Sequence, residues 1–249
     1  MKRFRDFLLG VLVFAGIGFL IYNLLQYDQK RTNRELARKI SELSPRRGGP
    51  PDSIEGLMQA IELYEAQIER NVMEGAQTGA YWKILAIRYA DNGMHQDALN
   101  ALERAIYFNA EDSVLFYLTG VSAGITAKSH VGFSQSAVNG REHYFALSEK
   151  AYLRSLELDD SYARPMYGLG ILYVFELERP QEAIPYLENL LLLAPSDIDA
   201  MFVLARAYFM TEQYTRAVNI YDRIISSTKN RRIIDEALNN IDIVERQSL

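Results

Sequence analysis

The chain has 249 residues, a net charge of −5 and no cysteine. The lack of cysteine excludes disulfides, thiolate metal sites and cysteine nucleophiles. Residues 1–47 carry a net charge of +6 and the remainder −11, so the larger part is poorly suited to nucleic acid, whose binding depends on neutralising phosphates.

The N-terminal part predicts a membrane anchor. A basic tail, residues 1–6, precedes the segment 7–25, which is apolar except for Tyr22 and Asn23. At the helical rise, the segment is about as long as the ~30 Å thickness of a bilayer's hydrocarbon core. The alternative is a cleaved secretory signal, but the apolar run exceeds the usual core of ~7–15 residues and no A-x-A cleavage site follows it. We therefore predict an uncleaved transmembrane helix over 7–25.

The basic residues on both sides of this segment leave its orientation open. Lys2, Arg3 and Arg5 precede it, and five basic side chains follow within residues 30–39. A bare count slightly favours a cytoplasmic C-terminal domain, but long domains translocate largely regardless of charge, whereas the basic tail resists export. We predict a protein of the bacterial cytoplasmic membrane with its C-terminal domain outside the cytoplasm; a cytoplasmic domain is the alternative.

A basic stalk and a linker follow over residues 26–51. The stalk permits a helix, and either contact with anionic head groups or a role as a solvated spacer fits its composition. SPRRGGPP at 44–51 breaks any helix and marks the domain boundary. Residues 52–249 then form the predicted C-terminal domain, in which a helix from Ile54 to about Arg70 serves as a packing helix or a degraded repeat.

Residues 79–112 predict two amphipathic helices joined by a turn at 91–93. Because large side chains on one helix match small ones on the other, we expect close packing that buries Trp82. The packing set comprises Trp82, Leu85, Ala86 and Tyr89 on the first helix, then Ala98, Leu102 and Ala105 on the second.

The same order of large and small residues recurs downstream. It is clear in residues 163–196 and 198–230 and degenerate in residues 113–162, where an insertion at 128–144 delays the second helix. The Ser, Gly and Asn content of the insertion predicts a loop. Residues 231–247 predict a terminal helix that covers the open end of the repeat array.

This pattern resembles the tetratricopeptide repeat (TPR), W-x2-L-G-x2-Y followed by A-x3-F-x2-A. The resemblance covers about residues 79–228, although Ala86 replaces the usual Gly, Leu102 the Phe and Ala110 the closing Pro. It implies an all-α fold in which helical hairpins stack into a right-handed solenoid. Together with the N-terminal transmembrane helix and the C-terminal capping helix, this is the predicted architecture.

The resemblance also implies a concave groove lined by the first helix of each repeat. The aromatic and aliphatic character of this groove favours an apolar peptide or helix as ligand. The alternative is that some of these side chains pack on the next repeat or on the insertion. The groove positions are Lys83, Ile87, Tyr117, Val121, Tyr167, Ile171, Phe202, Arg206 and Phe209.

No arrangement typical of catalysis stands out. The polar residues of the insertion show no oriented nucleophile–base pair, and Gly168-Leu169-Gly170 falls within a predicted helix, where small residues serve packing. We therefore predict a non-catalytic protein with no cofactor, no metal site, no nucleic-acid partner and no small-molecule substrate. Two functions remain. One is a membrane-anchored scaffold or adaptor that recruits a protein or peptide partner to an envelope complex. The other is a permanent structural subunit of a membrane assembly.

Overall fold

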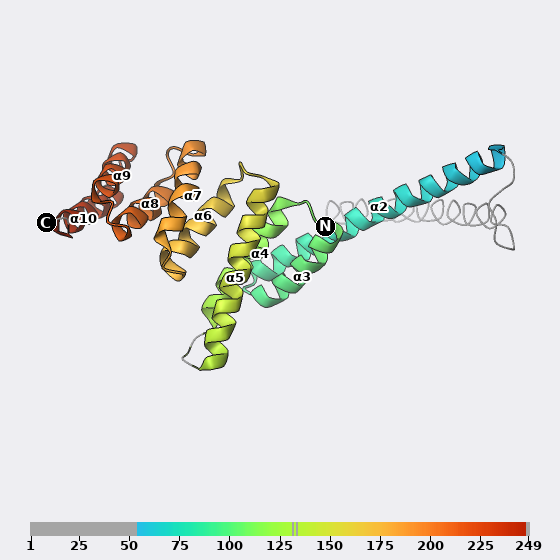
Figure 1. Ribbon diagram of the computed structural model, residues 1–249, viewed down its shortest axis with the longest axis horizontal. Helices are drawn as coiled ribbons and strands as arrows, with labels where there is room; N and C mark the ends of the chain where they lie inside the picture. Colours follow the sequence, from blue (N-terminus) through green and yellow to red (C-terminus); the bar gives the residue numbers. More distant parts are fainter. Residues whose placement is uncertain (1–53, 131, 133, 248–249) are drawn as a thin grey trace, which may run out of the picture. The chain divides into compact units, whose positions relative to one another are not determined.

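The computed structural model describes residues 54–130, 132 and 134–247, and its regular elements there are all helices (Figure 1). The predicted transmembrane segment 7–25 and the tail and stalk around it lie outside these residues. None of the helices in the described ranges is both long and apolar enough to cross a membrane. The helices are α2 (Ile54–Asp91), α3 (His95–Phe108), α4 (Ser113–Ser129), α5 (Gln135–Leu158), α6 (Ala163–Ile171), the π-helical turn η1 (Leu172–Glu176), α7 (Pro180–Leu193), α8 (Ile198–Met210), α9 (Tyr214–Ser227) and α10 (Arg231–Gln247).

The chain divides into two compact units, Met1–Glu74 and Gly75–Leu249. Within the second unit, successive helices lie side by side in chain order, and from α3 onwards each packs mainly on its neighbours (Figure 1). This is the quasi-one-dimensional organisation of a solenoid, in which each hairpin buries its apolar face against the next. The predicted all-α solenoid of helical hairpins is confirmed.

The first helix is longer than the sequence predicts. A helix ending near Arg70 was expected, whereas α2 continues to Asp91 without a break. No proline interrupts residues 71–91, and Gly75 and Gly79 remain helical within this range. At Gly79, the absence of a side chain lets α2 approach the end of α3: a Cβ there would lie 2.8 Å from the Cβ of Phe108 and would also overlap the amide of Asn109.

The expected packing positions are mostly buried. Ala86, Ala98 and Ala105 are almost fully enclosed, and at Gly170 a Cβ would lie 2.5 Å from Cδ2 of Leu187. The packing interpretation of the glycines in α6 is therefore confirmed. Trp82 is only half-buried, contrary to expectation. It belongs to the first hairpin of its unit, and the Arg104 guanidinium lies 5.9 Å from its ring.

The insertion is mostly helical, so the predicted loop over 128–144 is wrong beyond Ser134. The Ser134 hydroxyl caps α5 by accepting a hydrogen bond from the Ala137 amide at 3.3 Å. One turn later the His130 ring packs over Gly140, where a Cβ would lie 2.9 Å from Nε2. The buried Phe145 then fixes this part of α5 to the core. These contacts outweigh the local preference of Ser, Gly and Asn for loops.

The side chain of Tyr152 in α5 fills a gap between α4 and α6. A Cβ at Gly120 of α4 would lie 2.5 Å from Cδ1 of this ring, and one at Gly168 of α6 would lie 2.6 Å from Cζ. The ring is 7% exposed. Two glycines on different helices therefore form the space that one aromatic side chain occupies.

Candidate functional site

The face formed by α4 and α6 brings two of the predicted groove residues together. Val121 and Ile171 line a small pocket of about 150 Å³, whose wall also includes Ile125, Gly168 and the ion pair of Lys128 with Glu176. Val121 and Ile171 are half-buried and pack on the larger of the two core clusters, which extends from α4 to α10. The first helices of adjacent repeats thus present an accessible apolar surface at this point.

Three of the four predicted groove aromatics are partly buried between helices. Tyr117, Tyr167 and Phe202 are half-buried. The ring centroid of Tyr117 lies 6.2 Å from that of Tyr152, and the ring of Phe202 lies 6.1 Å from that of Tyr221. Burial raises the pKa of the Tyr167 phenol, and the nearby carboxylates at the start of α8 raise it further. Each of the three residues is therefore partly buried and partly accessible.

The remaining predicted residues lie towards the ends of the repeat array. The Lys83 ammonium forms an ion pair with Asp112 at 2.7 Å, which ties α2 to the turn before α4. Ile87 is exposed on the same helix. At the other end, the exposed Arg206 places its guanidinium 5.4 Å from the ring of Phe209. The two cations thus have partners within the chain.

A second concave surface lies between α3 and α5, where the sequence predicts no site. It is a cleft of about 720 Å³. The Tyr144 hydroxyl of α5 donates a 2.6 Å hydrogen bond to Oε1 of Gln96 in α3 and bridges its two walls. The cleft was not expected from the sequence, because the first part of α5 was predicted to be a loop. The lining residues include Leu99, Asn100, Glu103, Phe116, Leu147, Lys150 and Arg154.

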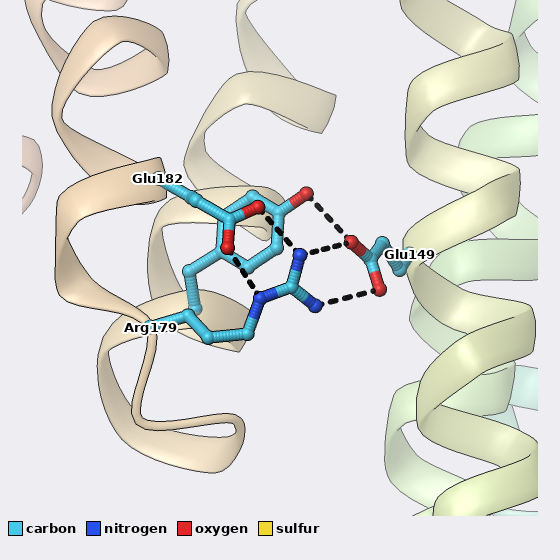
Figure 2. A network of polar contacts seen from close by, with 4 residues as sticks. Glu149, Arg179 and Glu182 are labelled. Carbon is cyan, nitrogen blue, oxygen red and sulfur yellow. Dashed lines mark hydrogen bonds and ion pairs between the residues drawn. The ribbon is translucent and has the colours of Figure 1, made fainter.

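A cluster of polar contacts joins α5 to the hairpin that follows it. Figure 2 shows Arg179, at the start of α7, between the carboxylates of Glu149 and Glu182. The two terminal nitrogens of Arg179 donate to Glu149 at 3.2 and 3.0 Å, and its Nε donates to Glu182 at 2.6 Å. The Tyr173 hydroxyl donates to Glu149 at 2.9 Å, and the Arg179 guanidinium lies 4.9 Å from the Tyr173 ring.

The same arrangement recurs one repeat later. Glu188 of α7 accepts hydrogen bonds from the Tyr208 hydroxyl and from Arg216. The Arg216 guanidinium lies 4.1 Å from the Tyr208 ring. We call these two Tyr–Glu–Arg sets, Tyr173–Glu149–Arg179 and Tyr208–Glu188–Arg216, the inter-repeat clamps. Each clamp joins the second helix of one repeat to both helices of the next.

The sequence does not reveal the clamps, because their members are not equally spaced. The glutamate lies 24 residues before its tyrosine in the first clamp and 20 before it in the second. Burial chiefly raises the pKa values of Tyr173 and Tyr208 above their ordinary value of 10.0, and the hydrogen bonds to the carboxylates raise them further. The hydrogen bonds from Arg179 lower the pKa of Glu182.

These shifts predict a loss of stability at alkaline pH. A phenol whose pKa is raised by folding stabilises the folded state fully below the unfolded-state pKa, and this contribution is lost as the pH rises through the folded-state pKa. We therefore expect unfolding to become easier above the ordinary pKa of 10.0. Urea denaturation at pH 8 and pH 11 measures the effect. A Tyr173→Phe/Tyr208→Phe variant should be less stable than the wild type at pH 8, with a smaller difference at pH 11. If the difference in stability between the two proteins were the same at pH 8 and pH 11, the two phenols would not cause the loss of stability at alkaline pH.

Comparison with known proteins identifies the repeats. Residues 174–240 match the family model described as "Tetratricopeptide repeat". A TPR repeat-containing protein of Borreliella burgdorferi is 19% identical over 196 residues, which cover 79% of this chain and 83% of the relative.

Solved structures show the same fold. YrrB, described as a TPR protein with an unusual peptide-binding site, superposes with a TM-score of 0.56 at 14% identity, over 72% of this chain and 84% of YrrB. MamA from Desulfovibrio magneticus RS-1 superposes with a TM-score of 0.51 at 16% identity, over 68% of this chain and 96% of that structure. Residues 174–240 thus match tetratricopeptide repeats, a relative described by the same repeat aligns over most of the chain, and the solved structures share the helical fold.

Proposed function

We propose that this protein is a non-catalytic, membrane-anchored scaffold or adaptor that binds a protein or peptide partner on the concave face of its TPR solenoid. The observation that carries the proposal is the apolar surface where Val121 and Ile171 line a shared pocket. Tyr117 and Tyr167, one helical turn before them on α4 and α6, are half-buried and retain accessible surface. Such a surface suits the apolar side chains of an extended peptide or an amphipathic helix.

The size of this pocket favours a peptide side chain over a small molecule. Small-molecule sites usually enclose about 300–1,000 Å³, whereas this pocket holds about 150 Å³. Aromatic residues at interfaces give large contact areas at low entropic cost. The similarity to YrrB, itself described as having a peptide-binding site, is consistent with a peptide ligand.

The membrane part of the proposal rests on residues 7–25 and their basic flanks. We place the protein in the bacterial cytoplasmic membrane with the repeat domain outside the cytoplasm, where it recruits its partner to an envelope complex. A cytoplasmic repeat domain is the alternative orientation. The alternative function is a constitutive structural subunit, for which the partner would occupy the concave face permanently.

Site-specific photo-crosslinking in living cells tests the proposal. A photoreactive phenylalanine analogue at Tyr167 should capture one discrete protein, and the adduct should remain in membranes washed with carbonate. The matched control position is Asp222, which is exposed on α9 and should give no adduct.

An adduct from Glu103 alone would move the site to the α3–α5 cleft, because Glu103 lines that cleft. An adduct released by carbonate would refute the anchor. A partner recovered at a fixed one-to-one ratio at every expression level would favour the structural subunit.

A further inference from the structure

The N-terminal part of α2, residues 54–74, carries an exposed apolar stripe with heptad spacing. In a heptad written abcdefg, an apolar residue at every a and d position forms the seam of a coiled coil. The five side chains of this stripe are 38–80% exposed, an unusual density of exposed apolar surface on one helix. They are Ile54, Ile61 and Ile68 at successive a positions, and Leu57 and Tyr64 at the d positions between them.

The charges of the segment lie where self-association tolerates them. Residues 54–74 contain five glutamates and one arginine, an excess that would oppose pairing if the acids met across the seam. Glu55, Glu62 and Glu69 instead occupy successive b positions, away from the seam. In a parallel pair, each g position faces the e position five residues later in the partner. Those facing pairs are Ala60 with Glu65 and Gln67 with Val72, so no two acids oppose each other there.

We propose that residues 54–74 pair with the same segment of a second copy of this chain as a parallel, two-stranded coiled coil. Isoleucine at a combined with leucine at d, as at Ile54 and Leu57, favours two strands, and Tyr64 occupies the second d position. In-register pairing sets each isoleucine against its counterpart, an isologous contact of a twofold dimer. Because α2 continues as one helix to Asp91, the pairing segment is extended from an existing helix and needs no separate nucleation. Asn71 and Gly75, at the next d and a positions, end the apolar seam.

The absence of cysteine from the chain makes disulfide crosslinking a direct test. The full-length chain in mild detergent is prepared as two single variants, Ile61→Cys at a and Glu62→Cys at b. On oxidation, Ile61→Cys should form a disulfide-linked pair of 28.5 kDa chains, with at least tenfold less product from Glu62→Cys. Equal crosslinking at both positions, or no crosslinked dimer from Ile61→Cys, would overturn the proposal.

Two further measurements test the alternatives. In one alternative the protein is a monomer, and in the other the apolar stripe is covered by another segment of the same chain. Sedimentation of the full-length wild type should give the mass of two chains, and Ile61→Asp/Ile68→Asp should give one chain while the thermal transition of the repeats is retained. A wild type that sediments as a single chain contradicts the proposal. In a Leu36→Cys/Ile61→Cys variant, an intramolecular disulfide that replaces the intermolecular one would show that the chain's own preceding segment covers the stripe, which also overturns it.

Discussion

Replacing Tyr152 with alanine is expected to destabilise the repeat domain by about 3–5 kcal/mol, the usual cost of removing a large aromatic side chain from a core. The ring is 7% exposed and occupies the gap left by Gly120 and Gly168 on two other helices. Since neither glycine has a side chain that can move into the vacated space, the cavity should persist. Urea denaturation of residues 52–249, followed by circular dichroism, measures the change.

The control for this prediction is Tyr107→Ala, which removes the same side chain from a position that is 77% exposed. Exposed substitutions usually change the free energy of unfolding by no more than about 0.5 kcal/mol. Similar losses for the two variants would show that Tyr152 does not serve as a packing element between α4 and α6.

Gly170→Ala is expected to destabilise the domain by about 1–3 kcal/mol through overpacking, although alanine favours a helix over glycine by about 1 kcal/mol. The new Cβ would lie 2.5 Å from Cδ2 and 2.9 Å from Cγ of Leu187. Leu187 is fully buried, so it has little freedom to withdraw. The loss should appear as a lower midpoint of urea denaturation.

Gly124→Ala provides the matched comparison, because this glycine is also helical but its Cβ would lie 3.4 Å from the Ser148 hydroxyl oxygen. That distance is an ordinary contact, so the helix preference of alanine should leave stability unchanged or slightly increased. If Gly170→Ala were as stable as Gly124→Ala, the helices would be less closely packed at this contact than the structure indicates. Combining Gly170→Ala with Leu187→Ala should give less than the sum of the two single losses, because the added methyl group enters the space that the leucine leaves.

Sequence periodicity was sufficient to predict the helical hairpins, because close packing between helices requires small residues at fixed positions. Ala86, Gly170 and Ala205 all occupy such positions and are buried. The composition of the insertion predicted a loop, but most of the insertion is helical. Ser134 supports this helix as its N-terminal cap, and the buried Phe145 supports it through a long-range contact. Propensity describes local preference, and tertiary contacts override it.

The candidate site could be predicted only in part. The predicted groove positions follow from the repeat pattern, and two of them, Val121 and Ile171, line one pocket. Sequence could not show how far Tyr117 and Phe202 are engaged with rings of neighbouring helices. The α3–α5 cleft and the inter-repeat clamps depend on residues from separate helices without a constant spacing. Such arrangements become visible only when the helices are placed in space.

The uneven distribution of the clamps has a consequence for the elasticity of the solenoid. Clamps join α5 to η1 and α7, and α7 to α8 and α9, whereas α4 carries Ala123 at the position of the clamp tyrosine. A chain of elastic elements in series deforms most at its softest joint. If a bound partner pulls on the two ends of this solenoid, we expect most of the bending between α3 and α5, at the cleft. Strain applied at one end would then widen or narrow that cleft and leave the curvature of the clamped C-terminal repeats nearly unchanged.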